Sequence, residues 1–149
     1  MNKKENEAIL IDKPYREASS EPDIKGRVPS MTYVSYRLIP ETPVYIRWGW
    51  IVDMPEPNPH IANHNHDYDE IVLHIGNDPA NPEDLGGELE FVVGDEPVVI
   101  NRTSALYLPR GVAHGPLTWR RVTRPHLEMA ITIGTGNFSK VIPGGYQGV

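Results

Sequence analysis

The chain has 149 residues, a formal net charge of −6 and no cysteine. This length suits one domain with a buried core, and the lack of cysteine excludes disulfides, thiolate ligands and a cysteine nucleophile. The negative charge argues against nucleic acid or an anionic membrane surface as the main partner. No apolar run approaches the length of a membrane span, and the first residues are too polar for a secretory signal. We therefore expect a cytoplasmic protein.

Residues 1–30 form a polar leader that contains prolines and has no helical period. We interpret it as an N-terminal extended arm, with a short strand at residues 8–11, that either packs across a partner subunit or is mobile. Residues 31–149 are expected to form a single domain. In the chain as a whole, 15 prolines and 13 glycines favour a turn-rich β protein over a helical one.

Short β-branched and aromatic runs between turn residues predict a series of strands. They span residues 31–39, 44–52, 70–75, 87–93, 98–100, 105–108, 114–120 and 126–133. The last two are expected to pair as a hairpin around residues 121–125. So many short strands indicate a barrel or a sandwich. The tail from Gly134 is rich in glycine, and Phe138 and Tyr146 are candidates to dock it.

The strand at residues 44–52 has two different faces, because side chains alternate along a strand. Trp48 and Trp50 share the more apolar face, and Arg47 lies on the other. Arg47 can clamp a substrate carboxylate bidentately, or it can lie at a solvated rim. Four aromatic residues either fill the core, which we favour, or line an apolar pocket: Tyr36, Trp48, Trp50 and Tyr107. Tyr107 is the second candidate for substrate binding.

The segment around His64 and His66 carries the clearest chemical pattern. Residues two apart in a strand share a face, so the two imidazoles are expected to point the same way. Residues 67–69 can turn the chain, and Glu70 then opens the next apolar run and can face the same point. Two imidazoles and one carboxylate that converge in this way form a facial metal site with open positions.

A second segment can complete this site. Residues 106–108 form a strand, Pro109 and Gly111 form a turn, and His114 begins the next strand. Proline presets φ and glycine accepts a positive φ, so the turn has a physical basis. His114 is therefore a candidate fourth ligand.

The two segments together resemble the signature motifs of the cupin superfamily. The metal-ligand positions of those motifs correspond to His64, His66, Glu70 and His114. The flanking positions differ, because the motif glycines and the closing asparagine are replaced or shifted at Asn58, Gly76, Thr103 and Thr118. The resemblance covers residues 44–133. It implies an all-β fold, a cupin-like double-stranded β-helix (jelly-roll) barrel, with one bound divalent transition metal and a homodimeric assembly.

Three further histidines must be weighed against this set. His74 shares a strand face with Glu70 but lies about 13 Å along the strand, so a position at the rim is expected. His126 is expected opposite Arg120 in the terminal hairpin, away from the site. His60 follows a run of prolines and is expected at the surface, although it can also reach the pocket mouth as a proton carrier.

These residues predict a metal-binding protein whose ion is Fe, Mn, Ni, Co, Cu or Zn. The favoured function is an enzyme that acts on a small oxygen-bearing molecule, as a dioxygenase or as a non-redox lyase or isomerase. Glu70 is the only candidate general base among the ligands. Two alternatives stay open: a barrel that binds a small ligand as a sensor, and a barrel whose metal only holds strands together. Asp67 and Asp69 can hydrogen-bond a ligand imidazole.

Overall fold

The computed structural model describes residues 7–16, 24–28 and 30–136. These residues form strands, turns and irregular segments, which agrees with the all-β prediction. The strands are β1 (Tyr15–Arg16), β2 (Lys25–Arg27), β3 (Met31–Val34), β4 (Val44–Glu56), β5 (Asp69–Ile75), β6 (Asp84–Val93), β7 (Glu96–Arg102), β8 (Ser104–Leu108), β9 (His114–Val122) and β10 (His126–Ile133). Among these residues, no helix has the length and apolarity needed to cross a bilayer.

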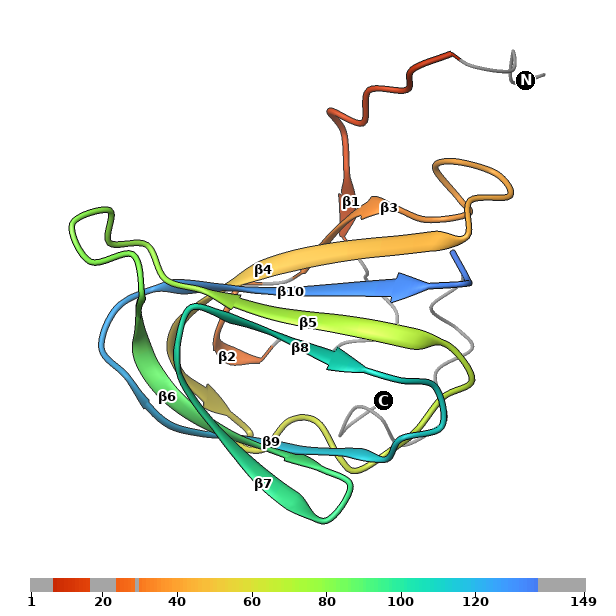
Figure 1. Cartoon of the computed structure of the whole chain (residues 1–149). Helices are drawn as coiled ribbons and strands as arrows, with labels where there is room; N and C mark the ends of the chain where they lie inside the picture. Colours follow the sequence, from red (N-terminus) through yellow and green to blue (C-terminus); the bar gives the residue numbers. More distant parts are fainter. Residues whose placement is uncertain (1–6, 17–23, 29, 137–149) are drawn as a thin grey trace.

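The strands build two antiparallel sheets. The larger sheet has the order β1-β3-β4-β10-β5-β8, with β2 paired to β4, and the smaller sheet has the order β7-β6-β9. Figure 1 shows β4, β10, β5 and β8 side by side, with the smaller sheet below them. The connections pass from one sheet to the other, as in a jelly roll.

The apolar core lies between the two sheets. Ile51, Val72 and Leu108 contribute to it from the larger sheet, and Leu89 and Trp119 from the smaller one. Each of these side chains is at most 7% exposed. The core occupies one part of the interior, which leaves another part for polar residues.

The inward face of β4 is the more polar one, contrary to our expectation that the aromatic residues fill the core. Tyr45, Arg47 and Ile51 are buried, whereas Trp48 and Trp50 are only half-buried on the outer face. The other two aromatic candidates, Tyr36 and Tyr107, are 42% and 54% exposed. The expectation was wrong because the interior of this barrel holds a polar site, so apolarity alone does not mark its inward face.

The predicted terminal hairpin is also wrong. β9 pairs with β6 in the smaller sheet, whereas β10 lies between β4 and β5 in the larger one. Residues 123–125 therefore carry the chain from one sheet to the other. As a result, His126 lies opposite Ile51 and not opposite Arg120.

Part of the expected N-terminal arm belongs to the larger sheet. No strand forms at residues 8–11; among the described residues the first strand is β1, which pairs with β3. β2 pairs with β4 and brings Arg27 beside Ile51. The expected contacts of Phe138 and Tyr146 fall outside the described residues.

Candidate metal centre

The segment between β4 and β5 is attached along β9, and this attachment places His64. The side-chain oxygen of Asn58 accepts a hydrogen bond from the Trp119 backbone N–H at 2.9 Å, and its amide nitrogen donates to the Trp119 carbonyl at 2.8 Å. Further along, Ile61 bridges to Leu117, and the backbone N–H groups of His64 and His114 each donate to the other's carbonyl. The segment therefore runs antiparallel to β9 and holds His64 opposite His114.

Three imidazoles converge at this point. One ring nitrogen from each of His64, His66 and His114 lies within 4.8 Å of the others. The ring centroids are 4.3 Å apart for His64 and His114, 4.8 Å for His66 and His114, and 5.8 Å for His64 and His66. His66 also stacks on Tyr68, with centroids 4.0 Å apart, which fixes its ring plane. The three histidines that the motifs single out thus lie together.

Glu70 enters the same point from β5. Its Oε2 lies 2.6 Å from His66 Nε2 and 3.7 Å from His114 Nε2. Burial by itself raises the pKa of Glu70, but the interactions of its carboxylate with the imidazoles of His114 and His66 outweigh burial and bring the pKa to about 2. Burial also lowers the pKa of His64. The centre therefore pairs an ionised carboxylate with a neutral imidazole.

Backbone carbonyls fix the tautomer of each of the three candidate histidine ligands. The Nδ1 atoms of His64, His66 and His114 each lie 2.9 Å from a carbonyl oxygen, of Ala62, Tyr68 and Val112 respectively. A carbonyl only accepts hydrogen bonds, so each Nδ1 carries the proton. In the neutral imidazole Nε2 then presents a lone pair, which is the state that a metal ion requires. These carbonyls take the role that was considered for Asp67 and Asp69.

Given this tautomer, the contact between His66 and Glu70 bears on whether the site holds a cation. If Nδ1 of His66 donates to Tyr68, its neutral Nε2 and the Glu70 carboxylate are both acceptors at 2.6 Å. Such a pair needs a cation between or beside the two atoms, either an added proton or a metal ion. His114 Nε2 is buried and has no hydrogen-bond partner among the described residues. The donor set of three imidazoles and one carboxylate fits a divalent transition metal.

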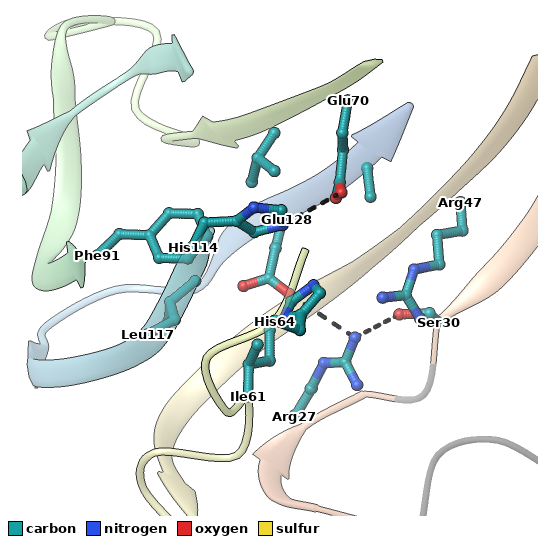
Figure 2. A pocket seen from close by; sticks show the side chains of 12 residues that line it. Arg27, Ser30, Arg47, Ile61, His64, Glu70, Phe91, His114, Leu117 and Glu128 are labelled. Atoms are coloured by element: carbon teal, nitrogen blue, oxygen red, sulfur yellow. Dashed lines mark hydrogen bonds and ion pairs between the residues drawn. The ribbon is translucent and has the colours of Figure 1, made fainter. Parts of the chain in front are cut away.

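A pocket that opens to solvent adjoins these residues. His64, His114 and Glu70 line it, together with Arg47 from β4. Arg47 is only 5% exposed, so it lies inside the barrel and not at a solvated rim. Figure 2 shows it pointing into the pocket.

Two charged residues of the cavity wall were not predicted. Arg27 reaches the pocket from β2, and Glu128 reaches it from β10 (Figure 2). The Arg27 side chain lies 3.7 Å from the Glu128 carboxylate and donates to Ser30 Oγ at 2.6 Å. The sequence pattern that could have identified Glu128 is the alternation of side chains along β10, which places His126, Glu128 and Thr132 on the inward face. Arg27 had no comparable signal, because it lay in the segment interpreted as an arm.

Tyr107 does not line the cavity. Its side chain is 54% exposed, and its hydroxyl donates to Asp69 at 2.7 Å. Asp69 also accepts a hydrogen bond from the Arg110 backbone N–H, so it ties β5 to the turn before His114. Tyr107 was expected to bind substrate; it lies on the outer face of β8 because residues alternate and its neighbour Leu108 is buried.

The remaining histidines are all buried, which corrects two expectations. His60 and His74 are 0% exposed, although we expected them at the surface and at the rim. His126 is also 0% exposed and, as expected, is not part of the cluster of candidate ligands. Trp119 contacts both His74 and His126, with ring centroids 5.7 and 4.9 Å apart. The rise along a strand could not distinguish a position at an exposed rim from one in a filled interior.

Comparison with known proteins places this fold. No family model matches the sequence, and no curated protein matches it. Among solved structures, the polyketide cyclase RemF from Streptomyces resistomycificus has a TM-score of 0.56 at 11% identity over 96% of this chain and 86% of that one. A predicted oxalate decarboxylase from Thermotoga maritima has a TM-score of 0.54 at 17% identity over 80% and 90%. A cupin-2 domain protein from Rhodospirillum rubrum has a TM-score of 0.50 at 9% identity over 84% and 71%.

The chain has the cupin fold. Its departures from the cupin motifs have visible structural roles. Asn58 replaces an opening glycine and makes the two hydrogen bonds that attach its segment to β9. Thr103 replaces the other opening glycine, and its hydroxyl accepts a hydrogen bond from the Gly76 N–H at 2.9 Å. The Asn58 contacts lie on the segment that leads to His64, whereas the Thr103 contact lies at the end of β5 remote from Glu70.

Proposed function

We propose that this cupin-fold protein is a metal-dependent enzyme that acts on a small oxygen-bearing organic molecule. The reaction is either a dioxygenation or a non-redox lyase or isomerase reaction. The observation that carries the proposal is the convergence of His64, His66, His114 and Glu70 beside a pocket that opens to solvent. Three imidazoles and one carboxylate leave two positions of a six-coordinate ion for substrate or O₂.

The proposed cofactor is one divalent ion of Fe, Mn, Ni, Co, Cu or Zn. When bound, it supplies polarisation of a substrate oxygen or, with a redox-active metal, a binding position for O₂. The chain itself supplies the orientation of the imidazoles through three backbone carbonyls. Glu70 is the proposed catalytic base, because its ionised carboxylate lines the cavity.

Two of the similar structures bear names that fit this class, a polyketide cyclase and a predicted oxalate decarboxylase. Identities of 11% and 17% carry no activity from those proteins to this one. They suggest polyketide-like and oxalate-like compounds as the first members of a substrate screen. A small-molecule substrate, a cytoplasmic location and a homodimer belong to the same proposal.

Exchange of bound water at the metal ion distinguishes an enzyme from a structural metal site. An enzyme needs open coordination positions, whereas an ion that only holds strands together is saturated by protein ligands. Protein reconstituted with Mn(II) is therefore expected to enhance water-proton relaxation, and added azide is expected to reduce the enhancement by displacing bound water. The His64→Ala/His66→Ala variant serves as the control that lacks the ion.

A tightly bound Mn(II) without any relaxation from exchanging water would contradict the enzyme proposal and favour the structural role. If exchange is present, an oxygen electrode divides the two reaction types, since only a dioxygenase consumes O₂ with its substrate. A ligand-binding barrel that acts as a sensor is favoured instead if compounds bind at the open positions and none of them is converted.

A further inference from the structure

Two segments that carry candidate ligands meet at one side of the metal centre. His66 lies just before β5, Glu70 is the second residue of that strand, and His114 begins β9. The turn at residues 109–113 leads from β8 to His114, and Glu70 pairs with Leu108 at the end of β8. Figure 1 shows this end of β8 beside the start of β5, before the chain returns as β9. The attachment of the turn to β5 therefore contributes to the position of His114.

The side chain of Asp69 makes that attachment. Its Oδ1 accepts a hydrogen bond from the Arg110 backbone N–H at 2.8 Å, and its Oδ2 accepts one from the Tyr107 hydroxyl at 2.7 Å. The Arg110 Nε atom also lies 3.5 Å from Oδ1. Both oxygens of one carboxylate are thus bonded to the segment that leads to His114. We call Asp69, Tyr107 and Arg110 the clasp.

Backbone hydrogen bonds connect the clasp to the candidate ligands. Gly111, next to Arg110, has a positive φ of 81° and donates its N–H to the His66 carbonyl at 2.8 Å. The carbonyl of Val112 accepts the hydrogen bond from His114 Nδ1 at 2.9 Å. The turn that Asp69 holds therefore contacts the backbone of one candidate ligand and the ring of another.

The clasp can act on the metal ion only through the positions of other residues. Asp69 does not line the pocket, and its bonds within the described part of the chain go to Tyr107 and Arg110. A ligand set that is already held in place loses less conformational freedom when the ion binds. Hydrogen bonds to a carboxylate are also stronger than those between neutral groups. The Asp69 side chain is 21% exposed, so water competes only partly for these bonds.

We infer that Asp69 and Tyr107 are positioning residues for the metal ion, which hold the turn so that His114 and Glu70 face one point. The clasp thereby sets the affinity for the ion. The inference deepens the proposed function and rests on it. It also gives a role to Tyr107, which is exposed on the outer face of β8 and does not line the pocket.

Competition for Mn(II) with a fluorescent chelator tests the inference. Asp69→Ala is expected to lose at least about tenfold in Mn(II) affinity, and Tyr107→Phe about threefold, because one of the two bonds to the carboxylate remains. Asp69→Asn is expected to keep most of the affinity, since an amide can accept from the Arg110 N–H and donate to the Tyr107 oxygen. In the Asp69→Ala background, Tyr107→Phe is expected to have no further effect, because Tyr107 acts through Asp69.

Asp67→Ala is the matched control. Asp67 also lies beside His66, but it is exposed and makes no hydrogen bond or ion pair within the described part of the chain. This variant removes the same charge near the ion and leaves the turn in place, so its Mn(II) affinity is expected to stay close to that of the wild type. An equal loss in Asp67→Ala and Asp69→Ala would overturn the inference, since charge alone would then explain both.

Wild-type affinity in folded Asp69→Ala and Tyr107→Phe would overturn the inference while the proposed metal site stands. The affinity of Tyr107→Phe decides the question if Asp69→Ala does not fold. A wild type that binds no Mn(II) would contradict the proposed function instead. Amide hydrogen exchange in the metal-free protein then decides whether the clasp holds the turn. Faster exchange at Arg110 and Gly111 in Tyr107→Phe, with unchanged exchange at Leu89 in the core, would support the clasp, and equal exchange at the turn would overturn it.

Discussion

Among individual residues, Glu70 is the most informative one to change, because it contacts two candidate ligands and lines the cavity. Glu70→Gln keeps the shape and removes the charge, so we expect metal affinity to fall by at least about tenfold. Competition with a fluorescent chelator measures the affinity. Glu83→Gln is the matched control, because its side chain is 74% exposed and its partner is Arg102. Equal affinities in wild type and Glu70→Gln would show that Glu70 is not a ligand.

His74 gives a prediction about pH. Burial lowers the pKa of His74 from 6.5 to about 4, so the unfolded chain takes up a proton between these values and the folded chain does not. Stability is therefore lost as the pH falls through this window. Because one pKa unit corresponds to 1.36 kcal/mol, His74 is expected to reduce the free energy of unfolding by about 2 kcal/mol between pH 7 and pH 5.

Urea unfolding in the presence of a chelator, at pH 7 and pH 5, measures this loss in wild type and in His74→Asn. The variant has no titrating group at this position, so its stability is expected to depend less on pH. Burial lowers the pKa of His126 as well, which leaves part of the dependence in place. The same pH dependence in both proteins would contradict the assignment to His74.

The sequence predicted that His64, His66 and His114 lie together, because each belongs to a short motif whose spacing is local. It could not predict Arg27 or the burial of His60. Both depend on how segments distant in sequence cross the interior, and no periodicity within a strand contains that information.

Among the structural elements, the segment between β4 and β5 deserves a test because it places two of the candidate ligands. Asn58→Ala removes two hydrogen bonds to Trp119 and leaves a strand backbone without these partners. We expect a loss of about 1–3 kcal/mol in the free energy of unfolding. Asn101→Ala is the control, since Asn101 is exposed and makes only a long contact to Glu88. Urea unfolding that gave the same loss for both variants would contradict the anchoring role of Asn58.

The eight strands expected from residue 31 onward are all present, with ends that differ by a few residues. Their pairing was harder to predict. Alternation along a strand fixes which residues share a face, but it does not fix which face turns inward or which strand is the neighbour. The prediction of a terminal hairpin was wrong for this reason. Only three residues separate β9 from β10, and such a short link normally indicates a hairpin. In this fold the link passes between sheets.

At the scale of the whole molecule, the outer face of the larger sheet is apolar. Met129 lies in its middle, between Trp48 of β4 and Leu73 of β5. Apolar patches of this kind often mark interfaces, so the homodimer inferred from the family resemblance stays a prediction with a defined surface. Sedimentation velocity is expected to show a species of about 33 kDa, twice the chain mass of 16.7 kDa.

Met129→Lys is expected to give the monomer, because a charge in the centre of an apolar interface is costly. Val99→Lys, at a side chain 49% exposed on the smaller sheet, is expected to leave the dimer intact. A wild-type protein that sediments as a monomer at all accessible concentrations would contradict the dimer.

The central claim is that the interior of this cupin fold holds one transition-metal ion. Elemental analysis of protein purified without a chelating tag, beside the His64→Ala/His66→Ala variant, tests it most directly. We predict about one equivalent of a divalent ion per chain in the wild type and a loss of that ion in the variant, since two of the candidate ligands are removed. Wild-type protein that holds no metal, even after anaerobic reconstitution with each candidate ion, would contradict the claim.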